Sequence, residues 1–120
     1  MTKPVEIDTR AALQRLGGDG ELLIHLIDMI REDSGVLLQG VTSALEAGDF
    51  LEVERALHSL RGLVSNVGCE SIREQALEME DFARRGDRSS VATALPVLRE
   101  TVSALLNKLA EARGEIDPSK

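Results

Sequence analysis

Apolar residues recur every three or four positions along most of this chain, a spacing that places them on one face of an α-helix. Glycines interrupt the pattern at intervals, and at three of these points an aspartate soon follows. Glycine is favoured just past a helix end, and an aspartate can accept hydrogen bonds from the first amides of the next helix. The breaks are Gly17-Gly18 before Asp19, Gly48 before Asp49, Gly68, and Gly86 before Asp87. The pattern therefore predicts helices that stop and restart at these points.

Five helices are predicted from this punctuation. They cover a short segment near 8–16, a long one near 19–47, two more near 49–67 and 69–86, and a last one that ends near residue 112. Gly35 and Gly40 weaken the long second helix and allow a bend there. Pro96 suggests that the last helix either begins only a few residues earlier or kinks at the proline.

The apolar stripes of the four longer helices predict the core. They comprise Leu23, Ile27, Ile30, Leu37, Val41 and Leu45; Val53, Leu57, Leu60, Val64 and Val67; Ile72, Ala76, Met79 and Ala83, with Phe82 at the edge; and Leu95, Leu98, Val102, Leu105, Leu109 and Ala112.

No segment shows the alternation of a β-strand, so the fold class is predicted to be all-α. Four amphipathic helices with short connections favour an up-down antiparallel four-helix bundle, with the short N-terminal helix capping one end. We expect one domain over 1–120, with an ordered core from about 7 to 112 and a flexible tail from about 114 to 120.

Composition narrows the function classes. The 120 residues carry a net charge of −7 and contain no Trp or Tyr, which argues against nucleic-acid binding. Cys69 is the only cysteine, so no internal disulfide or CxxC metal motif exists, and a reducing, cytoplasmic setting fits. Neither a signal peptide nor a membrane-spanning segment is expected. The chain could still be the cytoplasmic domain of a larger membrane-bound protein.

The stretch from 56 to 68, ALHSLRGLVSNVG, holds the candidate chemistry. On a helical wheel His58 falls roughly 130° from the centre of the apolar stripe of its helix, so it faces mostly outward. Its neighbours one turn away are Glu54, Arg55, Arg61 and Gly62, and Ser65 lies two turns on. Together with His58, these residues form the candidate site.

Gly62 is costly at this place, because glycine inside a helix is about 1 kcal/mol less favourable than alanine. A side chain four residues after His58 would cover the helix surface beside the imidazole, and glycine leaves that surface bare. The glycine is consistent with access for a partner. It could equally relieve crowding against another helix, or be neutral.

An exposed histidine can be a nucleophile, a general base or a metal ligand. Too few convergent ligands accompany His58 for a metal site. His25, the only other histidine, is expected to be solvated, and Cys69 is expected to be a small packed residue rather than a nucleophile. These exclusions leave chemistry by His58 alone, namely acceptance of a phosphoryl group on a ring nitrogen.

The same stretch resembles the signature of histidine-containing phosphotransfer domains. His58 is followed by an apolar residue two positions later, a basic residue at Arg61, a glycine at Gly62 and a second glycine at Gly68. The segments LQRLGGDGELL (13–23), ALEAGDF (44–50) and MEDFARRGD (79–87) are also similar to the family, so the resemblance covers roughly residues 7–110. The family most often has Lys where this chain has Arg61.

The resemblance implies a phosphorelay intermediate. A receiver domain carrying a phospho-aspartate would dock around His58, which would accept the phosphoryl group and pass it to the aspartate of a second receiver. The implied partners are response-regulator receiver domains and a sensor or hybrid histidine kinase. The implied domain is a monomeric covalent carrier rather than an enzyme, without a cofactor of its own, since Mg²⁺ belongs to the receiver. Arg61, and with less support Arg55, would offset phosphoryl charge, while Ser65 would hydrogen-bond near the site or to its own helix.

Two other function classes stay open at this level. The first is a helical-bundle interaction module that binds receiver or kinase domains but is never phosphorylated. The second is a hydrolase or another enzyme that uses His58 as a base, which would need a concave pocket and a second titratable partner.

Overall fold

The computed structural model describes residues 5–116 of the chain. Five α-helices and one 3₁₀ turn, joined by short connections, lie within this range. The elements are α1 (Thr9–Arg15), α2 (Gly20–Ala47), α3 (Phe50–Val64), η1 (Ser65–Val67), α4 (Glu70–Arg84) and α5 (Arg88–Ile116). No strand occurs among the described residues. The predicted all-α fold class is therefore confirmed.

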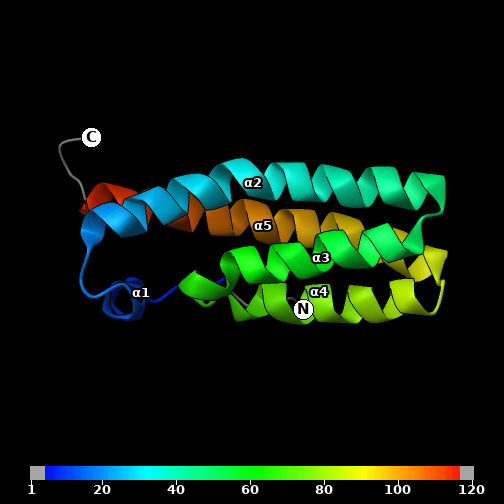
Figure 1. The fold of residues 1–120 in the computed structure, drawn as a ribbon, viewed down its shortest axis with the longest axis horizontal. Coiled ribbons are helices and arrows are strands. Elements are labelled where there is room, and N and C mark those ends of the chain that lie inside the picture. The colour runs from blue at the N-terminus through cyan, green and yellow to red at the C-terminus, as the bar shows by residue number, and fades with distance from the viewer. Residues whose placement is uncertain (1–4, 117–120) are drawn as a thin grey trace.

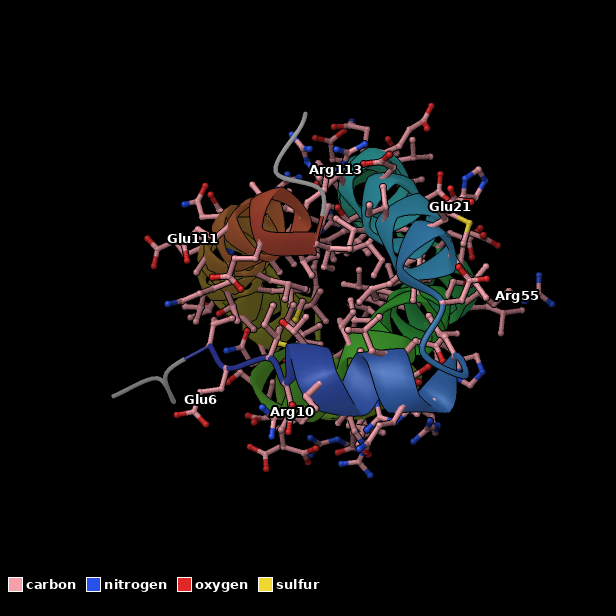
Figure 2. The ribbon with its side chains drawn as sticks, turned by 90° about the vertical axis from the view of Figure 1, so that its left-hand side faces the viewer. Glu6, Arg10, Glu21, Arg55, Glu111 and Arg113 are labelled. Carbon is pink, nitrogen blue, oxygen red and sulfur yellow. The ribbon has the colours of Figure 1, made fainter. Side chains whose placement is uncertain are left out.

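The four long helices run antiparallel to their sequence neighbours and form an elongated bundle of 46 × 26 × 22 Å (Figure 1). Helix α3 packs between α2 and α4, and α5 closes the ring by packing against the same two helices. Helix α1 lies across one end of the bundle, where it contacts η1 and the start of α2 (Figure 2). The arrangement is the up-down bundle with a capping N-terminal helix that short connections favour.

Aspartates begin the helices at the predicted restart points. The Asp19 carboxylate accepts a hydrogen bond from the amide of Leu22 at 3.0 Å, and the Asp49 carboxylate accepts one from the amide of Glu52 at 3.1 Å. Gly48 separates the second of these starts from the preceding helix, and its φ of 71° is one that residues with a side chain rarely adopt. The glycine-aspartate pairs thus set the helix boundaries as the sequence predicted.

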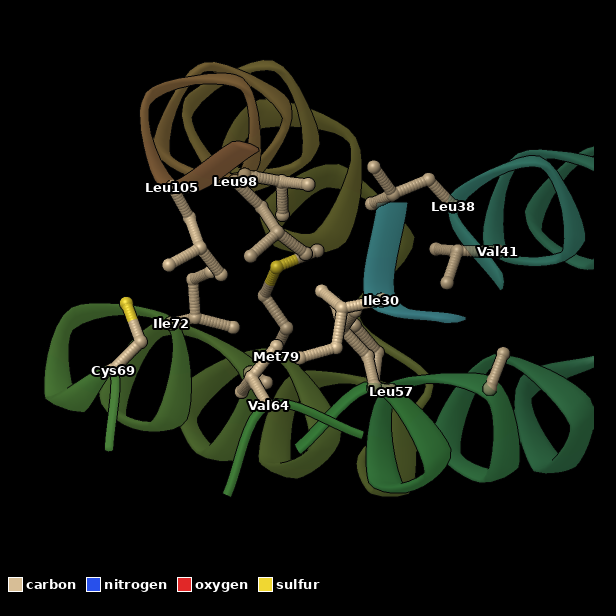
Figure 3. Close-up of a cluster of buried hydrophobic side chains, with 14 of the residues drawn as sticks. Ile30, Leu38, Val41, Leu57, Val64, Cys69, Ile72, Met79, Leu98 and Leu105 are labelled. Carbon is tan, nitrogen blue, oxygen red and sulfur yellow. The ribbon is translucent and has the colours of Figure 1, made fainter. Parts of the chain in front are cut away.

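The core lies between the four long helices and consists almost entirely of aliphatic side chains (Figure 3). All the predicted stripe residues of α3, η1, α4 and α5 are buried, and Phe82 is half-buried. On α2 the prediction of Leu37 is met only in part: it is half-buried and packs against the core, whereas Leu38 and Ser34 are fully buried. The core stripe of this long helix passes through Ser34 and Leu38, and Leu37 falls at its edge.

The last helix differs from the prediction at both ends. It begins at Arg88, well before Pro96, and runs through the proline without ending. Asp87 explains the early start, since its carboxylate accepts hydrogen bonds from the amide and the hydroxyl of Ser90 at 3.2 and 2.6 Å. A proline has no amide hydrogen, so the carbonyl one turn before Pro96 lacks its usual helical partner. Because Pro96 lies on the exposed side of the helix, this carbonyl is accessible to water.

The helix also continues to Ile116, so the predicted end near residue 112 and the predicted tail from 114 were wrong for residues 113–116. Arg113 stabilises this extension, because its guanidinium donates two hydrogen bonds to the Asp28 carboxylate on α2, at 2.8 and 3.1 Å. The rest of the predicted tail, 117–120, lies outside the described residues. The third predicted helix is likewise split, with an α-helix up to Val64 and a 3₁₀ turn at 65–67.

Candidate functional site

Helix α3 presents His58 to solvent because its opposite face is fixed in the core. Leu57 and Leu60, the core residues nearest to His58 in the chain, are completely buried. The His58 side chain is 72% exposed. A rigid helix that is held on one side by close packing thus carries an accessible imidazole on the other.

The helix surface beside His58 is bare at Gly62. A Cβ placed on Gly62 would meet no described atom within 4 Å, so this glycine does not relieve crowding against another helix. The Ser65 hydroxyl donates to the Gly62 carbonyl at 2.8 Å, which is the second of its two predicted roles, a bond back to its own helix. The Ser65 amide also donates to the Gly62 carbonyl, and this bond between residues three apart is of the 3₁₀ type found in η1. An open cleft of about 380 Å³ lies along this surface and is bordered by His58, Gly62, Ser65 and the start of α4.

Arg61 forms a two-pronged ion pair with Glu80 of α4. The Arg61 Nε donates to Glu80 Oε2 at 2.5 Å, and its Nη2 donates to Oε1 at 3.0 Å. The Glu80 side chain is only 5% exposed and that of Arg61 is 22% exposed. The hydrogen bonds from Arg61 to Glu80 raise the pKa of Arg61 above its ordinary value. The guanidinium therefore places a positive charge beside the histidine and pairs with a buried carboxylate.

The two nitrogens of His58 have different surroundings. Nδ1 faces the ion pair, with Arg61 Nη2 at 2.8 Å and Glu80 Oε1 at 3.8 Å. Nε2 has no hydrogen-bond partner among residues 5–116. The ring is consequently anchored through Nδ1, and Nε2 is the nitrogen that a docked molecule can reach.

The remaining predicted site residues lie further from the imidazole. Glu54 accepts a hydrogen bond from Arg84 Nη2 of α4 at 2.8 Å, which joins the two helices on the His58 side. Arg55 is 67% exposed, lies 3.6 Å from Glu52 and points away from the bundle (Figure 2). Both border, together with His58, a second open hollow of about 630 Å³. Neither residue forms a hydrogen bond or an ion pair with His58.

Sequence reasoning missed Glu80, the residue on which the geometry of the site depends. A signal was present, since Glu80 lies within the apolar stripe of α4, four positions after Ala76 and three before Ala83. A carboxylate on a buried face is rare unless it is paired. The stripe therefore could have predicted a buried acid that needs a cation from a neighbouring helix.

Sequence reasoning also missed two arginines near the end of α3. Arg73 of α4 borders the cleft beside His58 and pairs with Glu70 at 2.9 Å. Arg15 of α1 donates to the Asn66 carbonyl at 2.9 Å, so a positive charge stabilises the C-terminal end of the histidine-bearing segment.

Cys69 is buried at the start of α4, and burial raises the pKa of its thiol. Its burial confirms the prediction of a small packed residue, and a raised thiol pKa disfavours the reactive thiolate. His25 is exposed on α2, as expected. Within residues 5–116 no three His, Cys, Asp or Glu side chains gather into a metal-binding group. No helix in this part of the chain is long and apolar enough to cross a membrane.

Comparison with known proteins identifies the family to which this helical bundle belongs. The family model of the Hpt domain matches residues 25–108, which is most of the chain. The chain therefore belongs to the Hpt domain family. A search of curated proteins and a search of solved structures each gave no match.

Membership of the Hpt family indicates the general role of the chain. Hpt domains carry phosphoryl groups on histidine in two-component phosphorelays and act as carriers rather than catalysts. They interact with receiver domains and histidine kinases. The family resemblance of the sequence is thereby confirmed at this level.

Proposed function

We propose that this protein is a phosphorelay intermediate in which His58 accepts a phosphoryl group from the phospho-aspartate of one receiver domain and passes it to the aspartate of another. The observation that carries the proposal is the placement of the imidazole. It is exposed, it is anchored through Nδ1, and it stands beside the bare surface at Gly62.

The reaction needs little from the carrier beyond position and charge. Phosphoryl transfer proceeds with the attacking and leaving atoms roughly in line, and catalysis consists mainly of positioning and electrostatic stabilisation. In the proposed step Nε2 forms a bond to phosphorus while the phosphorus–oxygen bond to the donor aspartate breaks. The electron pair leaves with the aspartate carboxylate. The tautomer that reacts in this step carries its proton on Nδ1, and this proton stays there while Nε2 attacks.

The Nδ1 side of the ring supports that step. When Nε2 attacks, the imidazole gains positive charge, and a proton on Nδ1 is stabilised by a nearby carboxylate. Glu80 Oε1, 3.8 Å from Nδ1, is the carboxylate in position to do this. Arg61 lies on the same side and can offset the charge of the arriving phosphoryl group, as Arg73 can from across the cleft.

We expect the carrier to need no cofactor, with Mg²⁺ and the remaining catalytic groups supplied by the receiver. We also expect a monomer located in the cytoplasm, alone or as a domain of a membrane-bound hybrid kinase. The hollows beside His58 are open to solvent, which fits a surface for protein docking better than the water-excluding pocket that a hydrolase would require.

Phosphotransfer from a panel of phosphorylated receiver domains tests the proposal. Wild type should gain an acid-labile, base-stable label, and His58→Gln should gain none while keeping its helical circular dichroism. His25→Gln is the matched control, because it removes the other exposed histidine and should transfer normally. Label that persists in His58→Gln would refute the proposal. Receiver binding without transfer under any condition would favour the non-phosphorylated interaction module.

A further inference from the structure

The Nδ1 atom of His58 has two neighbours that require opposite proton states. Arg61 Nη2, at 2.8 Å, can only donate a hydrogen, because a guanidinium stays protonated and has no acceptor atom. Glu80 Oε1, at 3.8 Å, is beyond hydrogen-bond distance from Nδ1 in this structure, and as an ionised carboxylate it can only accept a hydrogen if the two atoms come closer. Nδ1 can satisfy only one of them at a time.

The shorter contact, from Arg61 to Nδ1, determines the tautomer of unphosphorylated His58. If Arg61 donates to Nδ1, that nitrogen holds a lone pair, and the single proton of the neutral imidazole must then sit on Nε2. Nε2 is the exposed nitrogen, and a protonated Nε2 has no lone pair with which to attack phosphorus. The resting geometry therefore holds the histidine in the tautomer that cannot accept a phosphoryl group at Nε2.

The position of Arg61 allows this restraint to be released. Its Nε bond to Glu80 Oε2 is separate from the Nη2 contact with Nδ1, so the guanidinium can turn while one prong of the ion pair remains. Its side chain is partly exposed at the edge of the cleft beside His58. A doubly charged phosphoryl group at Nε2 would attract the guanidinium more strongly than a neutral ring nitrogen does.

We propose that Arg61 restrains unphosphorylated His58 in the Nε2–H tautomer, and that an arriving phosphoryl group draws Arg61 away from Nδ1 so that Glu80 becomes the partner of this nitrogen. The proposal rests on the proposed function of His58. One proton leaves Nε2 for water and water delivers one to Nδ1, which the exposure of the ring allows. Arg61 is thus a positioning residue that limits reactivity until a donor has docked.

Nitrogen-15 NMR of the imidazole in the 120-residue protein tests this without any phosphodonor. At a pH where His58 is neutral, the shifts and ring couplings of the two nitrogens report the ratio of tautomers. Wild type should be mainly Nε2–H. In Arg61→Met, Glu80 takes over as the partner of Nδ1. The ratio of Nδ1–H to Nε2–H should rise at least about tenfold, because the loss of one charge-assisted hydrogen bond that favours Nε2–H is alone enough for that change.

Arg55→Met, which removes an exposed arginine of the same helix, is the control and should leave the ratio unchanged. Arg61→Lys covers the case in which Arg61→Met does not fold. Its ammonium keeps a charge opposite Glu80 but lacks the fork that reaches Glu80 and Nδ1 together, so the Nδ1–H fraction should again rise. An equal ratio in wild type and Arg61→Lys, or a wild type that is mainly Nδ1–H, would overturn the proposal. Phosphotransfer to His58 would be unaffected by that outcome, so the two proposals fail separately.

Discussion

The ion pair between Arg61 and Glu80 gives the most specific stability prediction. Replacing Arg61 with Met keeps much of the apolar stem of the side chain but leaves the Glu80 carboxylate, which is 5% exposed, without its two hydrogen bonds from the guanidinium. Removing one partner of a buried ion pair typically costs 3–5 kcal/mol. Because the Arg61 side chain is 22% exposed, water can partly reach the site, and we expect about 3 kcal/mol, at the lower end.

Urea unfolding followed by circular dichroism measures this cost. With a slope of about 1.5–2 kcal/mol per molar urea, the midpoint should fall by about 1.5–2 M. Arg55→Met is the matched control: it breaks an exposed pair with Glu52 and should stay within about 0.5 kcal/mol of wild type.

The double variant Arg61→Met/Glu80→Met shows how much of the lost stability is due to the missing ion pair and how much to the unpaired charge on Glu80. It should recover most of the lost stability, because no buried charge remains without a partner. The reasoning would be refuted if Arg61→Met unfolded at the wild-type urea concentration. It would also be refuted if the double variant were no more stable than the single one.

Three further outcomes are expected. Ser34→Ala should raise the free energy of unfolding by about 1 kcal/mol, because the Ser34 hydroxyl is buried without a partner among the described residues; a loss in urea unfolding would contradict this. Gly62→Leu should stabilise the helix by up to about 1 kcal/mol but slow phosphotransfer at least about tenfold. The control Gly35→Leu, at an equally open glycine of α2, should change stability without changing the rate of phosphotransfer. Equal transfer rates in the two variants would show that the bare surface beside His58 is not needed. The pKa of Asp28 is lowered mainly by its hydrogen bond from Arg113. The ionised carboxylate therefore stabilises the fold at a pH above the pKa that Asp28 has in the unfolded chain, and this contribution is lost as the pH falls below about 4. Asp28→Asn should consequently lose less stability than wild type when the protein is unfolded by acid.

Much of the bundle could be predicted from the sequence because its determinants are local. A left-handed glycine such as Gly48 followed by the capping carboxylate of Asp49 sets a boundary within a few residues. Helical periodicity likewise placed Leu57 and Leu60 in the core and His58 outside it. These features depend on residues that are close in sequence.

Two features that sequence reasoning missed depend on contacts between distant segments. The extension of α5 to Ile116 is supported by Arg113 pairing with Asp28, two residues that are 85 positions apart. The pairing of Arg61 with Glu80 crosses from α3 to α4, and a helical wheel of one helix cannot show it. The wheel correctly gave the direction of His58 but not the identity of the groups at Nδ1. For that reason the proton chemistry of the site required the structure.

The central claim, that His58 carries the phosphoryl group at Nε2, is tested most directly by locating the group in the phosphorylated protein. The protein would be loaded from a phosphorylated receiver domain. Fragmentation mass spectrometry under neutral conditions would identify the residue, and phosphorus–nitrogen couplings by NMR in the labelled protein would identify the atom. The account predicts one phosphoryl group on His58, bonded to Nε2, with the proton on Nδ1. A phosphoryl group on His25 or a carboxylate, or a bond to Nδ1 of His58, would contradict it.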